Sequence, residues 1–216
     1  MTQLIYIADP MCSWCYGFGP ELDALLAGMP EAQMDIIVGG LRAYNTELMD
    51  EQKKATILGH WKHVAEASGL PFSNDGMSQP GFVYDTEPAC RAVVATRILA
   101  DDLAPRAKLA VFRAIQHAFY AEGLDVTKPK VLSDVCVAAL NAADGGDDYD
   151  VDSFQETLTA YSTSAETRED FEQTQRWGIR GFPALLLVHE GALHMIASGY
   201  TRTADLLESL RQVQQG

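Results

Sequence analysis

The sequence predicts an α/β protein in which a βαβ unit and a ββα unit flank a long helical block. Short apolar runs with strand character occur near the two ends of the chain, at residues 3–8, 34–38, 181–188 and 193–198. From about residue 47 to residue 176 the apolar residues instead recur at helical spacing, with almost no strand signal. We therefore expect one domain formed by residues 1–46 and 177–216, and an inserted helical domain at residues 47–176.

The N-terminal unit is expected to contain a parallel strand pair. The first strand ends at Asp9-Pro10, because proline cannot continue a strand ladder. A helix is expected from about Trp14 or Tyr16 to an end near residues 28–30, with a kink at Pro20. The strand at residues 34–38 follows, and a strand–helix–strand succession this short implies parallel pairing.

Turn and cap signals divide the rest of the chain. Thr86 is a candidate N-cap for a helix running toward Leu103, and the acidic stretch at residues 144–148 indicates a loop. Glu190-Gly191 is typical of a hairpin turn between the last two strands. Thr201 or Thr203 then begins a final amphipathic helix.

Composition limits the classes of partner. The chain has 216 residues, a formal net charge of -14 and a pI near 4.6, which argues against nucleic acid and anionic membranes as partners. It contains no apolar run of the roughly 18 residues that a membrane span needs, and its first residues lack the pattern of a secretory signal. The sequence therefore favours a cytoplasmic location.

The motif that carries chemistry is Cys12-Ser13-Trp14-Cys15, at the junction of the first strand and the first helix. Free backbone N–H groups and the helix dipole stabilise a thiolate at a helix N-terminus, and lower cysteine pKa values from about 8.5 to roughly 3.5–7.5. The first cysteine of such a pair attacks a disulfide, and the second resolves the mixed disulfide. We expect Cys12 to be the exposed attacking thiolate and Cys15 the resolving thiol. Asp9 opposes this arrangement, because a negative charge near Cys12 disfavours the thiolate.

Zinc binding is the alternative function of a Cys-x-x-Cys pair. A structural zinc site needs four ligands, and the sequence offers no second pair. His60 and His63 lie one helical turn apart without a third ligand nearby, so we predict no metal site. Cys90 and Cys136 each share a helical face with aliphatic residues and are expected in the core.

The motif order resembles the thioredoxin fold with a helical insertion, as in the DsbA-like family, and its cytoplasmic FrnE-like branch of protein-disulfide isomerases most closely. The resemblance spans nearly the whole chain and rests on Asp9-Pro10-Met11-Cys12-Ser13-Trp14-Cys15-Tyr16-Gly17-Phe18, Gly39-Gly40-Leu41, Thr86-Glu87-Pro88-Ala89-Cys90-Arg91-Ala92 and Gly178-Ile179-Arg180-Gly181-Phe182-Pro183.

This resemblance implies that Pro183 follows a cis peptide bond and lies beside the cysteine pair. It also implies that the backbone of Phe182 binds an extended substrate segment by strand addition. Phe182 departs from the small or β-branched residue often found before this proline, so we expect it to reshape substrate choice. Ser13 and Trp14 are expected to tune the redox potential.

The sequence thus predicts a thiol–disulfide oxidoreductase or isomerase that acts on cysteine-containing peptides or proteins. It needs no bound cofactor, and glutathione or a thioredoxin-type protein is a candidate reductant. The first alternative is a glutathione-dependent enzyme of the kappa-class transferase or 2-hydroxychromene-2-carboxylate isomerase type, in which serine usually stands where this chain has Cys12. The second is a peptide-binding, chaperone-like protein without turnover.

Overall fold

The computed structural model describes residues 2–101, 104–143 and 148–215. Four strands form one mixed sheet in the order β2-β1-β3-β4. β1 pairs in parallel with β2, from Gln3 opposite Gln33 to Ala8 opposite Val38, and pairs antiparallel with β3. The strands are β1 (Gln3–Ala8), β2 (Gln33–Val38), β3 (Ala184–His189) and β4 (Ala192–Ser198). The predicted α/β class and the parallel first pair are confirmed.

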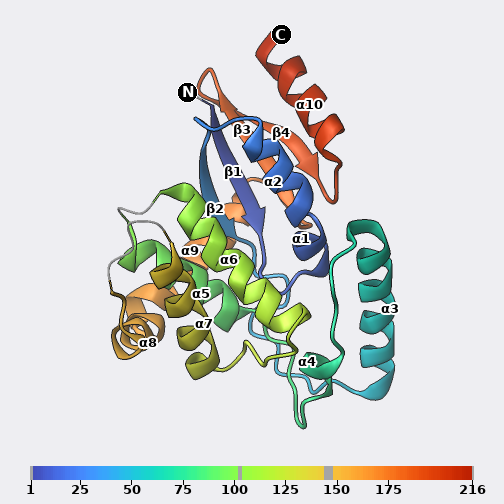
Figure 1. Ribbon diagram of the computed structural model, residues 1–216, viewed down its shortest axis with the longest axis vertical. Coiled ribbons are helices and arrows are strands. Elements are labelled where there is room, and N and C mark those ends of the chain that lie inside the picture. The colour runs from blue at the N-terminus through green and yellow to red at the C-terminus, as the bar shows by residue number, and fades with distance from the viewer. Residues whose placement is uncertain (1, 102–103, 144–147, 216) are drawn as a thin grey trace.

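The helical elements follow the predicted order (Figure 1). The helices of the two flanking units are α1 (Ser13–Gly17), α2 (Gly19–Ala27) and α10 (Thr203–Gln215). The block inserted between β2 and β3 contains α3 (Glu51–Ser68), α4 (Asp75–Ser78), α5 (Glu87–Leu99), α6 (Pro105–Tyr120), α7 (Pro129–Ala142), α8 (Val151–Thr159) and α9 (Tyr161–Arg176).

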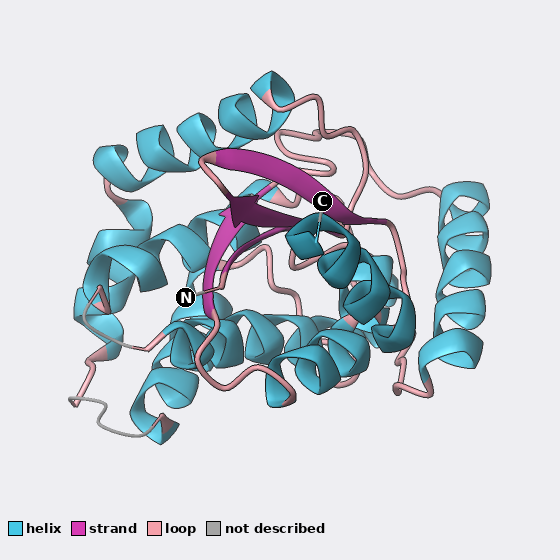
Figure 2. Ribbon diagram, turned by 90° about the horizontal axis from the view of Figure 1, so that it is seen from above, coloured by secondary structure: helices cyan, strands magenta, loops and turns pink. Residues whose placement is uncertain are grey.

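The two faces of the sheet are covered differently. α2 and α10 lie over one face, together with α6, whose Phe112 ring packs against Tyr6 of β1 at a centroid distance of 5.7 Å (Figure 1). The view from above shows helices on both sides of the strands (Figure 2). On the other face Ile5, Ile7 and Leu186 pack with Ile179 in a small cluster of their own. The carboxyl end of β1 points into the region between α1 and the helical block, so the residues that follow β1 meet elements from both parts of the chain (Figure 1).

Proline acts differently in the first helix from what the sequence predicted. The chain forms two helices, α1 and α2, separated at Phe18, in place of one kinked helix. Pro20 lies in the first turn of α2, where its missing N–H leaves no intrahelical bond unmade. The proline therefore begins a helix where a kink was expected.

The ends of α5 differ in detail from those that the sequence predicts. α5 ends at Leu99, short of the predicted residue 103. Thr86 is the residue before α5, but its side chain makes no cap bond and instead accepts the backbone N–H of Arg42 at 3.1 Å. Residues 144–147 of the predicted acidic loop lie outside the described residues.

A buried ion pair joins the helical block to the edge of the sheet. Arg97 on α5 pairs with Asp170 on α9 at 3.0 Å and with Glu166 at 2.8 Å. Asp170 also accepts the backbone N–H of Val38, at the end of β2, at 3.1 Å. Burial raises the pKa of Asp170, and the hydrogen bond and charge of Arg97 oppose this rise. Arg97 therefore compensates a carboxylate that would otherwise be isolated.

Replacing this cation is expected to destabilise the protein. Arg97→Met leaves Asp170 buried without a counter-ion, which should lower the free energy of unfolding by about 3 kcal/mol. The matched control is Glu166→Gln, because the Glu166 side chain is 40% exposed and its loss preserves the inner pair. This control should change stability by less than about 1 kcal/mol. Urea denaturation measures both, and equal losses in the two variants would contradict the interpretation.

Candidate functional site

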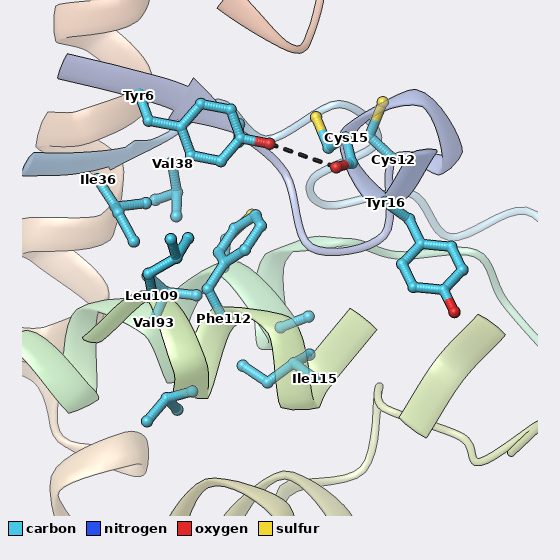
Figure 3. Packing of buried hydrophobic residues seen from close by; sticks show 14 of the residues in the cluster. Tyr6, Cys12, Cys15, Tyr16, Ile36, Val38, Val93, Leu109, Phe112 and Ile115 are labelled. Atoms are coloured by element: carbon cyan, nitrogen blue, oxygen red, sulfur yellow. Dashed lines mark hydrogen bonds between the residues drawn. The ribbon is translucent and has the colours of Figure 1, made fainter. Parts of the chain in front are cut away.

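The two cysteines of the motif lie where β1 passes into α1. Cys12 is the N-cap residue of α1, and its backbone N–H donates to the Asp9 carbonyl at 3.0 Å. Cys15 lies one turn later, and both sulfur atoms point in the same general direction (Figure 3). Both are free thiols. Cys12 is only 5% exposed, so the prediction of an exposed thiol is wrong. Cys15 has no exposed surface.

The segment before β3 approaches the first thiol. The peptide bond between Phe182 and Pro183 is cis, and the Cys12 Sγ lies 3.7 Å from the Phe182 carbonyl oxygen. Sheet pairing between β1 and β3 begins at Ala184, so the backbone of Phe182 lies outside the β1–β3 ladder. The sequence motifs at residues 12–15 and 181–183 therefore meet in space.

The Phe182 ring packs against Gly39, at the end of β2. A Cβ atom built on Gly39 would lie 2.1 Å from the ring, so only glycine leaves room for it. This contact joins the segment before β3 to the loop after β2. The Phe182 ring therefore packs within the site, and the Phe182 carbonyl faces Cys12.

Asp9 is fully buried beneath the reactive turn. Its Oδ1 accepts the Met11 N–H at 2.8 Å, and its Oδ2 accepts the Leu41 N–H at 2.6 Å. Burial raises the pKa of Asp9, and hydrogen bonds from Thr86, the Met11 and Leu41 backbones and Cys90 oppose this rise. The Asp9 side chain thus joins the turn at Met11 to the loop at Leu41, and both of its oxygens accept hydrogen bonds.

Tyr84, which precedes α5, holds the same turn from the other side. Its hydroxyl donates to the Met11 carbonyl at 2.5 Å and lies 3.4 Å from the hydroxyl of Tyr120. Burial is the first cause that raises the pKa of Tyr84, so it stays a neutral donor. The helical block therefore provides part of the support for the residue before Cys12.

Trp14, between the cysteines, packs outward against the C-terminal unit. Its ring centroid lies 5.5 Å from that of Tyr200. The Tyr200 hydroxyl donates to Glu21 at 3.2 Å, and Glu21 accepts the Thr203 N–H at 2.7 Å, at the start of α10. Ser13 and Trp14 are both partly buried. The motif is thereby connected to α2 and α10.

The remaining chemistry depends on burial. Desolvation is the first cause that raises the pKa of Cys15 well above its ordinary value, and its interaction with Cys12 adds to this rise. Tyr6 donates its hydroxyl to the Cys15 carbonyl at 3.4 Å (Figure 3). Cys90 and Cys136 are fully buried, as predicted, although Cys90 lies beside Asp9 and not in a purely apolar core. The site thus contains one thiol with a small exposed fraction, Cys12, and one fully buried thiol with a raised pKa, Cys15.

The sequence indicated the cysteine pair, and the family resemblance placed Pro183 beside it, but neither indicated the side chains that support the reactive turn from other elements. Tyr84, Tyr200 and Glu21 had no signal as site residues, because each contacts the motif or its support only after folding. Asp9 was recognised as a nearby charge, but its two backbone partners were not.

The sheet with a cysteine pair after its first strand and helices inserted between β2 and β3 defines a thioredoxin-fold protein of the DsbA type. The chain resembles, at 32% identity and a TM-score of 0.85, a Nitrosomonas europaea protein named "putative protein disulfide isomerase", covering 99% of this chain and 98% of that one. The chain belongs to the DsbA-like family of thioredoxin-fold oxidoreductases.

Two further structures extend the comparison. The cytosolic disulfide reductase DsbM from Pseudomonas aeruginosa is 25% identical, with a TM-score of 0.75 and coverage of 99% of this chain and 100% of that chain. A 2-hydroxychromene-2-carboxylate isomerase shares the fold at 12% identity, a TM-score of 0.65 and coverage of 99% and 96%. No family model and no curated protein matches the chain.

The Asp9 network makes a specific prediction. Asp9→Asn retains one acceptor oxygen, so either the buried Met11 N–H or the partly buried Leu41 N–H loses its partner. We expect a loss of about 1–3 kcal/mol in the free energy of unfolding, together with slower disulfide turnover.

Asp85→Asn is the matched control for this substitution. Asp85 accepts the Tyr44 N–H at 2.8 Å and the Glu87 N–H at 3.0 Å with the same oxygen, Oδ1, which asparagine also has. The control should therefore be close to wild type in urea denaturation and in turnover. Similar losses in Asp9→Asn and Asp85→Asn would refute the assigned role of the two Asp9 oxygens.

Glu21 is expected to contribute stability that depends on pH. Hydrogen bonds from Thr203 lower the pKa of Glu21 below its ordinary value of 4.5. Its contribution is therefore present above that value and is lost as the pH falls through the lower folded pKa. Glu21→Gln should reduce stability at neutral pH by about 1 kcal/mol, as for a lost helix cap. Urea denaturation should show this difference narrowing in acid, whereas a constant difference would rule out the carboxylate as its source.

Proposed function

We propose that this protein is a thiol–disulfide reductase or isomerase in which Cys12 attacks a substrate disulfide and Cys15 resolves the intermediate. One arrangement carries the proposal. Cys12 is the N-cap residue of α1, and its Sγ lies 3.7 Å from the Phe182 carbonyl oxygen. Cys15 lies one helical turn later and has no exposed surface. A substrate disulfide that reaches this site meets Cys12 first.

The proposed cycle transfers two electrons to the substrate. The Cys12 thiolate forms a bond to one substrate sulfur, the substrate disulfide breaks, and the other substrate sulfur leaves as a thiolate. Cys15 then loses its proton and attacks the Cys12 Sγ, which releases the substrate as a dithiol and leaves a Cys12–Cys15 disulfide. A dithiol protein or two molecules of glutathione would reduce this disulfide again. The raised pKa of Cys15 supports its role as the thiol that stays protonated until the mixed disulfide has formed.

A cytoplasmic location and a reductive direction support each other in this proposal. The similar Pseudomonas protein is named a cytosolic disulfide reductase, and a reducing cytosol keeps most dithiols reduced at rest. Within the described residues no helix is long and apolar enough to cross a membrane.

Substrate binding is proposed for the backbone of Phe182 and for Pro183. Phe182 lies outside the β1–β3 ladder, and its carbonyl faces the Cys12 Sγ. An extended substrate segment that pairs with this backbone would place its cysteine beside Cys12. We also propose that Ser13 and Trp14 tune the redox potential, since Trp14 is held by Tyr200. Residues 1–46 with 177–216 and residues 47–176 are proposed as the two folding units.

Glutathione-dependent chemistry is the second candidate. One structure of the Pseudomonas protein contains GSH, which supports glutathione as a reductant or a small substrate for this chain. The 2-hydroxychromene-2-carboxylate isomerase shares only the fold, and the intact cysteine pair here favours disulfide exchange.

The decisive test is to trap the intermediate. Cys15→Ser retains the attacking thiol and removes the resolving thiol, so the variant should accumulate mixed disulfides between Cys12 and its substrates. Mass spectrometry after non-reducing separation identifies the adducts and the cysteine that carries them.

The control variants are Cys12→Ser and Cys12→Ser/Cys15→Ser. Neither should form adducts, and insulin reduction by Cys12→Ser should fall by at least about 10²-fold, since the attacking thiolate is gone. Turnover that survives in Cys12→Ser would contradict the thiol mechanism. Adducts that contain only glutathione would favour the second candidate.

A further inference from the structure

A polar cleft of about 420 Å³ lies between the first turns of α3 and the segment at residues 42–50. Its lining includes Arg42, Glu47, Asp50 and Lys53, with Ile57 as an apolar wall. The same segment begins directly after Leu41, whose N–H is bound by Asp9. The cleft is therefore joined to the reactive turn by a hydrogen-bonded connection only a few residues long.

The two cations that line this cleft, Arg42 and Lys53, differ in their ion pairs. Lys53 forms ion pairs with Glu47 at 2.7 Å and with Asp50 at 3.9 Å. Arg42 forms no ion pair with any carboxylate in the part of the chain that the structure describes, although the protein as a whole carries a net charge of -14. Arginine without an internal partner in such an acidic chain is available to an external anion.

The Arg42 guanidinium lies over the Tyr84 ring. Its central carbon lies 5.3 Å from the centroid of the Tyr84 ring, and the Arg42 backbone N–H donates to Thr86 at 3.1 Å. Tyr84 in turn binds the Met11 carbonyl at 2.5 Å, next to Cys12. One tyrosine side chain thus lies between the guanidinium and the reactive turn, and Arg42 is itself exposed to an external anion.

We propose that Arg42 forms a carboxylate-binding subsite that selects acidic peptide disulfides, a specificity that rests on the disulfide exchange proposed above. Arginine binds carboxylates through paired N–H donors. An extended peptide advances roughly 3.3 Å per residue, so three residues span roughly 10 Å. This is the scale of the Tyr84 side chain and its contacts with Arg42 and the Met11 carbonyl, so the carboxylate is proposed about three residues from the substrate cysteine. Leu41, Tyr44 and Leu48, close to Arg42 in the chain, are exposed and offer apolar contacts to a bound peptide.

The acidity of the whole protein does not oppose such a substrate at close range. Salt screens charges over about 8 Å at physiological ionic strength, so remote carboxylates contribute little at this subsite. Within the cleft, the formal charges of Arg42 and Lys53 balance those of Glu47 and Asp50, and Lys53 pairs with Glu47 at 2.7 Å and Asp50 at 3.9 Å. A substrate carboxylate that approaches Arg42 therefore meets no net negative charge from the lining of the cleft.

The test compares two disulfide peptides that differ in one residue, glutamate or glutamine, placed three residues from the cysteine. Wild type should prefer the glutamate peptide in kcat/KM by about 3- to 10-fold, and added salt should reduce this preference. Arg42→Glu should abolish or reverse the ratio, and Arg42→Lys should restore part of it. Amidated and free C-termini distinguish a side-chain carboxylate from a terminal one.

Arg211→Glu on α10 is the control, because Arg211 is exposed and its one ion pair among the described residues is with Glu208 of its own helix, at 3.2 Å. It should leave the peptide preference at the wild-type value. Equal kcat/KM values for the two peptides in wild type, or an unchanged ratio in Arg42→Glu, would overturn the subsite. Absence of turnover with every peptide would instead refute the proposed disulfide exchange. The wild-type comparison stands even if a variant fails to fold.

Discussion

The buried carboxylate of Asp9 is the constraint on which the arrangement of the site depends. Its two oxygens bind the N–H groups of Met11 and Leu41, which belong to loops that follow adjacent strands. A single acceptor group thus fixes both the turn that presents Cys12 and the loop that leads to Arg42. Asp9 is fully buried, so loss of its bond to Met11 would leave an unpaired donor away from water, and loss of its bond to Leu41 would leave a buried carboxylate oxygen without this donor.

The inserted helical block takes part in the site and does more than extend the fold. Tyr84 binds the Met11 carbonyl, and Thr86 contacts both Asp9 and the Arg42 backbone. Both residues lie just before α5, so the position of this helix is transmitted to the cysteine turn. The buried pair of Arg97 and Asp170 fixes the same helix against α9 and the end of β2. The insertion is thereby anchored at the sheet edge and at the reactive turn.

Sequence patterns predicted the parts of this molecule that depend on local chemistry. Apolar runs revealed four strands, and the placement of Cys12 and Cys15 after the first strand indicated redox chemistry before any contact was known. Two kinds of feature were not predictable. Pro20 begins a helix instead of bending one, because proline is compatible with both roles and packing decides between them. The contact of Phe182 with Gly39 joins residues that are adjacent only in the folded sheet, so no local pattern encodes it.

The difference in burial between Cys12 and Cys15 supports the proposed order in which they react. In that proposal the substrate is selected in the first step, the attack by Cys12. Cys15 has no exposed surface and a raised pKa, which supports its proposed role as the second thiol to react. Cys12 itself is only 5% exposed and faces the Phe182 carbonyl, so the proposed substrates are disulfides presented along that backbone. Any discrimination among substrates must therefore come from the surface that surrounds Cys12. Asp9 binds the N–H of Leu41, next to Arg42, and Tyr84 packs against the Arg42 guanidinium, which forms no ion pair with the described carboxylates. The hydrogen bonds of Asp9 and Tyr84 that hold the turn of the proposed nucleophile therefore also connect it to the group proposed to choose its substrate.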